Sequence, residues 1–268
     1  NNYFGVDRND ISIKPIVLLF SDAYTSPDDL FNIDKDSVVY QFSQKLNQQN
    51  WLVKNNFYSY EIGTTLSLSS LFNFNLSRDK SYGNESLDNP NLIRASLIDS
   101  LERKEVDFIN LGLFQIGESP SVSFLKLTAT SFFETVMMNT IYYTLKLNTN
   151  NFKMNGLNNS FYPMTNHNKY IFKTLNDTLN QVTDSKTFIY THLLMPHIPF
   201  EFGDEFPLKK ENNLTNYKAF WNFTNSKLLV LLNQLIEDNK FRIILTGDHG
   251  FNGDERINPH HTFAAFYG

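Results

Sequence analysis

The segment Asp248-His249-Gly250 places a carboxylate and an imidazole next to each other, directly after the apolar run from Ile243 to Leu245. This pair of side chains suits a divalent metal, zinc above all. The glycine that follows would allow the backbone to turn sharply away from a strand. A polar turn after a buried strand has the same composition, so the segment alone does not establish a metal site.

Histidines concentrate in the last third of the chain, which contains all but one of the six. His192 and His197 flank an apolar segment after a predicted strand, and neutral imidazole is the commonest nitrogen ligand of metals. A hydrogen-bonding core histidine is an equally good interpretation of either one. His260 and His261 precede the last predicted strand, where one would complete a metal site or both would be solvated. His167 lies in an Asn-rich segment, and we expect it at the surface.

Hydroxyl side chains open a predicted helix from Thr64 to Phe72. A hydroxyl at a helix N-terminus lies at the positive end of the helix dipole, near backbone N–H groups that have no helical partner. A metal beside Thr64 would favour its deprotonated, nucleophilic form. An N-cap followed by ordinary helix-surface serines is the simpler interpretation of the composition.

The composition excludes several classes of site and partner. The 268 residues include no cysteine, which rules out disulfides, thiolate metal ligands and a cysteine nucleophile. The formal net charge of −5 argues against nucleic acid as the main partner, because phosphate backbones require a basic surface. No apolar run approaches the roughly 20 residues that span a bilayer, and no signal peptide is recognisable. The chain begins without Met, and we expect it to be a fragment of a longer protein.

Short apolar runs alternate with amphipathic segments along the chain. This alternation predicts an α/β fold with a mostly parallel central sheet and helices on both faces. We expect the Asn-rich segment 148–168 to be a surface insertion. The predicted strands cover residues 16–20, 55–60, 106–111, 187–191, 241–245 and 262–267. The predicted helices begin at 26 and 38 and cover 64–72, 91–102, 124–145, 170–182 and 217–236.

Three of the predicted strands are followed by side chains that bind metals. Asp22 follows the first strand, His192 follows the fourth, and Asp248 with His249 follows the fifth. In open parallel sheets, ligands bind beyond the carboxyl ends of the strands. We therefore expect these side chains to converge at one edge of the sheet, and this convergence indicates a metal site more strongly than any single motif.

Taken in this order, these segments resemble the alkaline phosphatase superfamily. The resemblance is to its sulfatase-like, membrane-associated branch, which includes phosphoethanolamine transferases and lipoteichoic acid synthases. It extends from about residue 16 to 267 and rests on Asp22 and on the stretches Thr64–Ser70, His192–Phe200 and Thr246–Gly250. It implies an alkaline-phosphatase-like fold and one sulfatase-like catalytic domain over residues 1–268, belonging to a longer membrane-anchored protein.

The resemblance also implies roles for individual residues. Asp22, Asp248 and His249 would bind one divalent metal, zinc above all, with manganese and magnesium as alternatives. Thr64 would be the nucleophile bound to that metal, because the nucleophile of the family stands three residues before the serine that Ser67 matches.

Further residues would complete the site by the same resemblance. His197 would bind a second metal or contact the transferred group, and His261 or His260 would take the same role beside His197. His192 would line the site as a catalytic residue, and Asn91 falls at a substrate-contact position of some relatives.

The sequence lacks the Cys/Ser-x-Pro-x-Arg motif of classical sulfatases, which favours phosphorus esters over sulfate esters. We expect a metal-dependent phosphoryl-group transferase with a Thr nucleophile. Its substrates would be lipid or glycan phosphoesters of the cell envelope, on the extracytoplasmic or periplasmic side. Membrane attachment would come through segments outside this chain. Two alternatives stay open: a phosphodiesterase, phosphatase or sulfatase-like hydrolase of the same fold, and a non-catalytic relative that binds a ligand.

Overall fold

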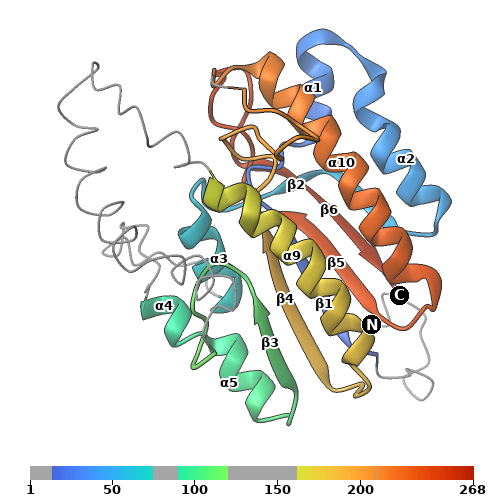
Figure 1. Cartoon of the computed structure of the whole chain (residues 1–268). Helices are drawn as coiled ribbons and strands as arrows, with labels where there is room; N and C mark the ends of the chain where they lie inside the picture. Colours follow the sequence, from blue (N-terminus) through green and yellow to red (C-terminus); the bar gives the residue numbers. More distant parts are fainter. Residues whose placement is uncertain (1–13, 75–89, 120–161, 210) are drawn as a thin grey trace, which may run out of the picture.

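A six-stranded sheet in the order β2-β6-β5-β1-β4-β3 forms the centre of the computed structural model (Figure 1). The structure describes residues 14–74, 90–119, 162–209 and 211–268. The parallel pairs are β1 with β4, β1 with β5, and β3 with β4, whereas β6 pairs antiparallel with β2 and β5. The strands are β1 (Ile16–Ser21), β2 (Leu52–Tyr58), β3 (Asp107–Leu111), β4 (Thr187–Leu193), β5 (Arg242–Gly247) and β6 (His261–Tyr267).

The sheet has helices on both faces, as the sequence predicts. Along β1, Val17 and Leu19 pack in one core cluster with residues of α2, α9 and α10. Leu18 and Phe20 point the opposite way and pack with residues of α3 and α5, because successive side chains of a strand alternate between its faces. The helices are α1 (Pro27–Asp34), η1 (Ser37–Tyr40), α2 (Gln41–Gln48), α3 (Thr64–Phe72), α4 (Pro90–Ile93), α5 (Ser96–Glu102), α9 (Tyr162–Gln181) and α10 (Leu214–Glu237).

Local sequence explains where several helices begin and end. The hydroxyl of Ser26 accepts hydrogen bonds from the backbone N–H groups of Asp28 (3.2 Å) and Asp29 (3.4 Å), and Pro27 occupies the first helical position of α1. The single helix expected over 91–102 is divided into α4 and α5, because Ala95 adopts an extended conformation (φ −73°, ψ 124°). The helix expected over 124–145 lies outside the described residues.

The largest departure from the sequence prediction is at the start of α9. This helix begins at Tyr162, so the end of the Asn-rich segment is helical and is not part of a surface insertion. His167 and Asn168 are buried, at 2% and 1% exposure, and the expectation of a surface His167 is wrong. Both side chains bond to the backbone of β4 and the residues after it, which offsets the cost of burying polar groups.

One edge of the sheet collects the carboxyl ends of five strands. Since β2 and β5 are both antiparallel to β6, β2 runs in the same direction as β5, β1, β4 and β3. The start of α3, which follows β2, therefore lies at the same edge as Asp22, His192 and Asp248. Within the described part of the chain, no helix combines the length and the apolar composition that crossing a membrane requires.

Candidate metal centre

Two buried carboxylates lie at the ends of the neighbouring strands β1 and β5. Asp22 is 4% exposed and Asp248 is 2% exposed. The Oδ1 atom of Asp248 accepts hydrogen bonds from the backbone N–H groups of Ala23 (3.0 Å) and His249 (2.8 Å). By contrast, Asp22 Oδ1 and Asp248 Oδ2 are buried and have no hydrogen-bond partner among the described residues. Burying a carboxylate is costly unless a cation pairs with it, so these two oxygens indicate a cation site.

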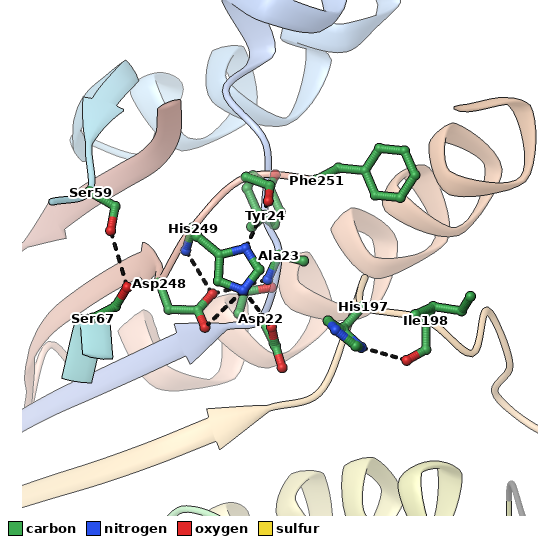
Figure 2. Close-up of polar contacts among 12 residues, drawn as sticks. Asp22, Ala23, Tyr24, Ser59, Ser67, His197, Ile198, Asp248, His249 and Phe251 are labelled. Atoms are coloured by element: carbon green, nitrogen blue, oxygen red, sulfur yellow. Dashed lines mark hydrogen bonds and ion pairs between the residues drawn. The ribbon is translucent and has the colours of Figure 1, made fainter. Parts of the chain in front are cut away.

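His249 directs one ring nitrogen towards both carboxylates. Its Nε2 atom lies 3.6 Å from Asp22 Oδ1 and 3.7 Å from Asp248 Oδ2, and Figure 2 shows the ring beside both carboxylates. Its Nδ1 atom lies 2.7 Å from the carbonyl oxygen of Gly250. A carbonyl oxygen only accepts, so Nδ1 bears the hydrogen of the neutral ring and Nε2 presents a lone pair. This support of the second nitrogen is typical of histidines that bind metals.

The glycines around the Asp248-His249 pair are required by close packing. A Cβ atom on Gly247 would lie 2.0 Å from Thr262 Oγ1, and a Cβ atom on Gly250 would lie 2.6 Å from the carbonyl oxygen of His261. Neither glycine has a positive φ. Gly250 therefore allows the chain to approach β6, and it does not provide the unusual turn conformation that the sequence suggested.

His192 joins the two carboxylates from β4. One ligand atom each from Asp22, His192 and Asp248 lies within 4.8 Å of the other two. The His192 side chain is fully buried, and its Nε2 atom has no hydrogen-bond partner among the described residues. Burial lowers the pKa of His192 to about 4, although the charge of Asp248 acts in the opposite direction. The ring is therefore neutral at neutral pH, which is the form that binds metals.

The pair His260-His261 lies at the start of β6, beside other partners. His261 Nδ1 is 3.0 Å from Asp29 Oδ1, and its Nε2 is 3.0 Å from Asn258 Nδ2. His260 Nδ1 is 2.8 Å from the carbonyl oxygen of Ser59, and its ring stacks on Tyr58 with centroids 5.4 Å apart. His261 is thus not a member of the Asp22–His192–Asp248 group, and its role as a metal ligand stays a prediction.

His197 and Asn91 also lie outside that group. His197 is half-buried in the loop after β4, and its Nδ1 atom bonds to the carbonyl oxygen of Ile198 (Figure 2). Its Nε2 atom is therefore the nitrogen available to exchange a proton. Asn91 belongs to α4, but its side chain is outside the described part of the structure.

Thr64 is the first residue of α3, as the sequence predicts, and is half-buried. Gly63 occupies the N-cap position and offers no side chain to the free N–H groups there. The loop before the helix is fixed to the segment before β6, because the backbone N–H of Ser59 donates to the carbonyl oxygen of His260 (2.7 Å). Ser67 continues this loop contact through its hydroxyl, which lies 3.3 Å from that of Ser59 (Figure 2).

The neighbouring Thr65 differs from Thr64 in its surroundings. It is 1% exposed, and its Oγ1 atom has no hydrogen-bond partner among the described residues. The nucleophile role of Thr64 stays a prediction, and Thr65 is the residue against which to test it.

Three residues that support His192 were not predicted from the sequence. Tyr190 Oη lies 3.0 Å from His192 Nδ1, and His167 Nε2 lies 2.9 Å from the carbonyl oxygen of His192. Asn168 bonds to the backbone N–H (2.7 Å) and carbonyl oxygen (3.2 Å) of Leu194. Of the three, only Tyr190 could have been inferred from the sequence as a neighbour of His192, because residues two apart in a strand share a face.

Comparisons with known proteins identify the family and the fold of this chain. The family model described as Sulfatase matches residues 14–265. Among solved structures, the chain is similar to the C-terminal periplasmic domain of phosphoethanolamine transferase EptC from Campylobacter jejuni, with a TM-score of 0.53 and 16% identity over 96% of this chain and 79% of that one. It is also similar to the corresponding EptC domain from Escherichia coli in complex with Zn, with a TM-score of 0.52 and 15% identity over 97% and 74%.

A third similar structure is a protein in the alkaline phosphatase superfamily from Vibrio parahaemolyticus, with a TM-score of 0.50 and 13% identity over 96% of this chain and 60% of that one. The search of curated proteins gave no match. At these identities the solved structures establish the alkaline-phosphatase-like fold, and the family model extends over nearly the whole chain. The chain belongs to the Sulfatase family.

Proposed function

We propose that this chain is the catalytic domain of a metal-dependent phosphoryl-group transferase with Thr64 as its nucleophile. The main support is the pair of buried carboxylates, Asp22 and Asp248, each with an oxygen that has no hydrogen-bond partner among the described residues. His249 is the only described side chain in an ion-pair contact with either of them. A neutral His249 leaves both charges uncompensated, and a protonated one offsets only one of them.

A divalent cation fits this set of donors. Asp22, Asp248 and His249 would hold it, together with the hydroxyl of Thr64 at the start of α3. Mixed oxygen and imidazole ligands favour zinc, with manganese or magnesium as alternatives. When bound, the metal would stabilise the negative charge that develops on the phosphoryl group. His197 and His261 are proposed to contact the transferred group or a second metal, and Asn91 to contact substrate.

The chain's own residues would perform two displacements at phosphorus. Thr64 Oγ1, having lost its proton to solvent, forms a bond to phosphorus while the bond to the donor's alcohol oxygen breaks. Protonated His197 gives its Nε2 proton to that leaving oxygen, because its Nδ1 proton is held by the Ile198 carbonyl. An acceptor hydroxyl then gives its proton back to His197 and attacks phosphorus, and the bond to Thr64 breaks. His192 lines this site.

The substrate class follows from chemistry that the sequence lacks. The chain has no Cys/Ser-x-Pro-x-Arg motif, in which classical sulfatases modify the Cys or Ser, and this favours phosphorus esters. The similar structure from Campylobacter jejuni is named as a domain of a phosphoethanolamine transferase. We therefore propose lipid or glycan phosphoesters of the cell envelope as substrates, and an extracytoplasmic location with membrane attachment outside this chain.

The test combines metal analysis with three chromogenic substrates. Zinc-loaded protein should cleave bis-p-nitrophenyl phosphate in preference to p-nitrophenyl phosphate and p-nitrophenyl sulfate. Mass spectrometry of the trapped enzyme should find the added group on the peptide that contains Thr64. Thr64→Ala should lower kcat by on the order of 10³-fold or more, as loss of a nucleophile does. Thr215→Ala, an exposed threonine in the first turn of α10, is the matched control.

The same experiment separates the alternatives. If Thr64→Ala keeps full activity and Thr65→Val loses it, the nucleophile is Thr65 and not Thr64. Rapid release of the group to water, with no preference for an added sugar or lipid hydroxyl, would identify a hydrolase. Protein that binds no stoichiometric metal and cleaves no substrate would refute the catalytic proposal and leave the non-catalytic alternative.

A further inference from the structure

We propose that His192 is itself a metal ligand through Nε2 and that Tyr190 is the positioning residue that fixes its ring and tautomer. This role differs from the one that the resemblance implies, in which His192 only lines the site. It rests on the metal dependence of the proposed function, but it is independent of the substrate and of Thr64.

One ring nitrogen of His192 lies within 4.8 Å of an oxygen of each carboxylate, and its buried Nε2 has no hydrogen-bond partner among the described residues. A histidine that serves only as a core hydrogen bonder should have both ring nitrogens satisfied, because an unpaired buried polar atom is costly. The Nδ1 atom of His192 bonds to Tyr190, which leaves Nε2 as the nitrogen that can face Asp22 and Asp248. Asp22 Oδ1, Asp248 Oδ2 and His192 Nε2 are thus three buried atoms without a hydrogen-bond partner among the described residues.

Aromatic packing holds the His192 ring in this direction. Its centroid lies 5.9 Å from that of Phe20 and 6.3 Å from that of Phe114. The ring of Tyr190 is held in turn by an edge contact with Phe72, whose centroid is 5.2 Å away. Gly112 closes the other side, because a Cβ atom there would lie 2.2 Å from Tyr190 Cε1. The Tyr190 hydroxyl therefore has little freedom to leave His192 Nδ1.

The main chain at His192 is also fixed, by the first described side chains of α9. His167 Nε2 bonds to the carbonyl oxygen of His192, and Asn168 bonds to both backbone groups of Leu194. Both the backbone and the ring of His192 are consequently preset. Rigid support of this kind is what a metal ligand requires.

Tyr190 is suited to select the metal-binding tautomer. Its hydroxyl lies 3.0 Å from His192 Nδ1, and a phenol oxygen can accept a hydrogen bond as well as donate one. When Nδ1–H donates to Tyr190 Oη, the lone pair of the neutral ring is on Nε2, facing Asp22 and Asp248. The carbonyl oxygen of Gly250 has the same function for His249.

The test is a zinc affinity measurement on four proteins, by competition with a chromogenic chelator. Tyr190→Phe keeps the packed ring and removes only the hydroxyl, so it should weaken zinc binding about 10- to 100-fold, as loss of a partner behind a metal ligand does. His192→Gln should weaken it at least as much. Tyr267→Phe is the control, because this tyrosine packs on Trp51 at the end of β6, on the opposite edge of the sheet.

Nitrogen-15 NMR of the histidine rings gives a second readout that needs no variant. In zinc-loaded wild-type protein, His192 should show a protonated Nδ1 and a metal-bound Nε2. A protonated Nε2 in that state, or zinc affinity within about twofold of wild type in His192→Gln, would overturn the inference even if the metal binds elsewhere. If the wild-type protein binds no zinc, manganese or magnesium at all, both this inference and the proposed function fail.

Discussion

Replacing Asp22 by Asn should stabilise the metal-free protein and reduce the further stabilisation that zinc provides. Asp22 is the better choice of the two carboxylates, because Asp248 also accepts two backbone hydrogen bonds. Among the described residues, His249 is the one ion-pair partner of the Asp22 side chain, at 3.6 Å. Asn is nearly the same size, so the substitution changes the charge with little change in packing.

The magnitude follows from the separation of the charges. The ligand oxygens of Asp22 and Asp248 lie within 4.8 Å of each other, which corresponds to a repulsion of about 3.5 kcal/mol at an effective dielectric constant of about 20. Removing it should raise the free energy of unfolding of chelator-treated protein by up to about 3 kcal/mol. At roughly 2–4 °C per kcal/mol, the upper limit for the rise in Tm is roughly 6–12 °C.

Zinc should remove most of this difference in stability, because it stabilises the wild-type protein more than the variant. Zinc at about 100 times its Kd stabilises the wild-type fold by about 2.7 kcal/mol. An Asp22→Asn variant that binds zinc about 100-fold more weakly gains only about 0.4 kcal/mol at the same concentration. The assay is thermal unfolding followed by circular dichroism, in chelator and in a zinc series. Asp177→Asn, at an exposed position of α9, is the control and should show no difference between the two conditions.

Two outcomes would refute this reasoning. If Asp22→Asn is less stable than wild type in chelator, the buried carboxylates are compensated within the protein and do not require a cation. If zinc raises the Tm of both proteins equally, Asp22 does not bind the metal.

Two further predictions concern the surroundings of His192. Gly112→Ala should lower the free energy of unfolding, measured in urea, by about 1–3 kcal/mol and weaken zinc binding, because its Cβ would lie 2.2 Å from the packed ring of Tyr190. A decrease below about 0.5 kcal/mol would show that Tyr190 moves freely. Burial lowers the pKa of His167 from 6.5 to about 4, so the folded state favours the neutral ring. The resulting contribution to the free energy of unfolding is complete above about pH 6.5 and is lost as the pH falls through about 4. Urea titrations at pH 7 and pH 5 should therefore show a larger loss of stability in wild type than in His167→Gln, and equal losses would contradict the assignment.

The sequence by itself predicted most of the helices and strands and the convergence of Asp22, His192 and Asp248. The apolar run of β1 and the hydroxyl-rich start of α3 are local patterns, and each predicted its element closely. Asp22 and Asp248 were predicted to meet because the carboxyl ends of parallel strands share one edge. Each of these inferences depends on residues close together in the chain or on a general rule of α/β topology.

Only the tertiary structure decided the partners of the histidines. His261 pairs with Asp29, which is 232 positions away, and His167 turns inward to bond the backbone of His192. A histidine that is solvated, buried or ligating can have the same local sequence, because its state depends on which distant donor or acceptor it meets. The reversed direction of β6 had no local cause either, since a strand has the same side-chain pattern in either direction. The residues that bind and those that support them are therefore distinguished by long-range contacts, which the order of residues along the chain does not specify.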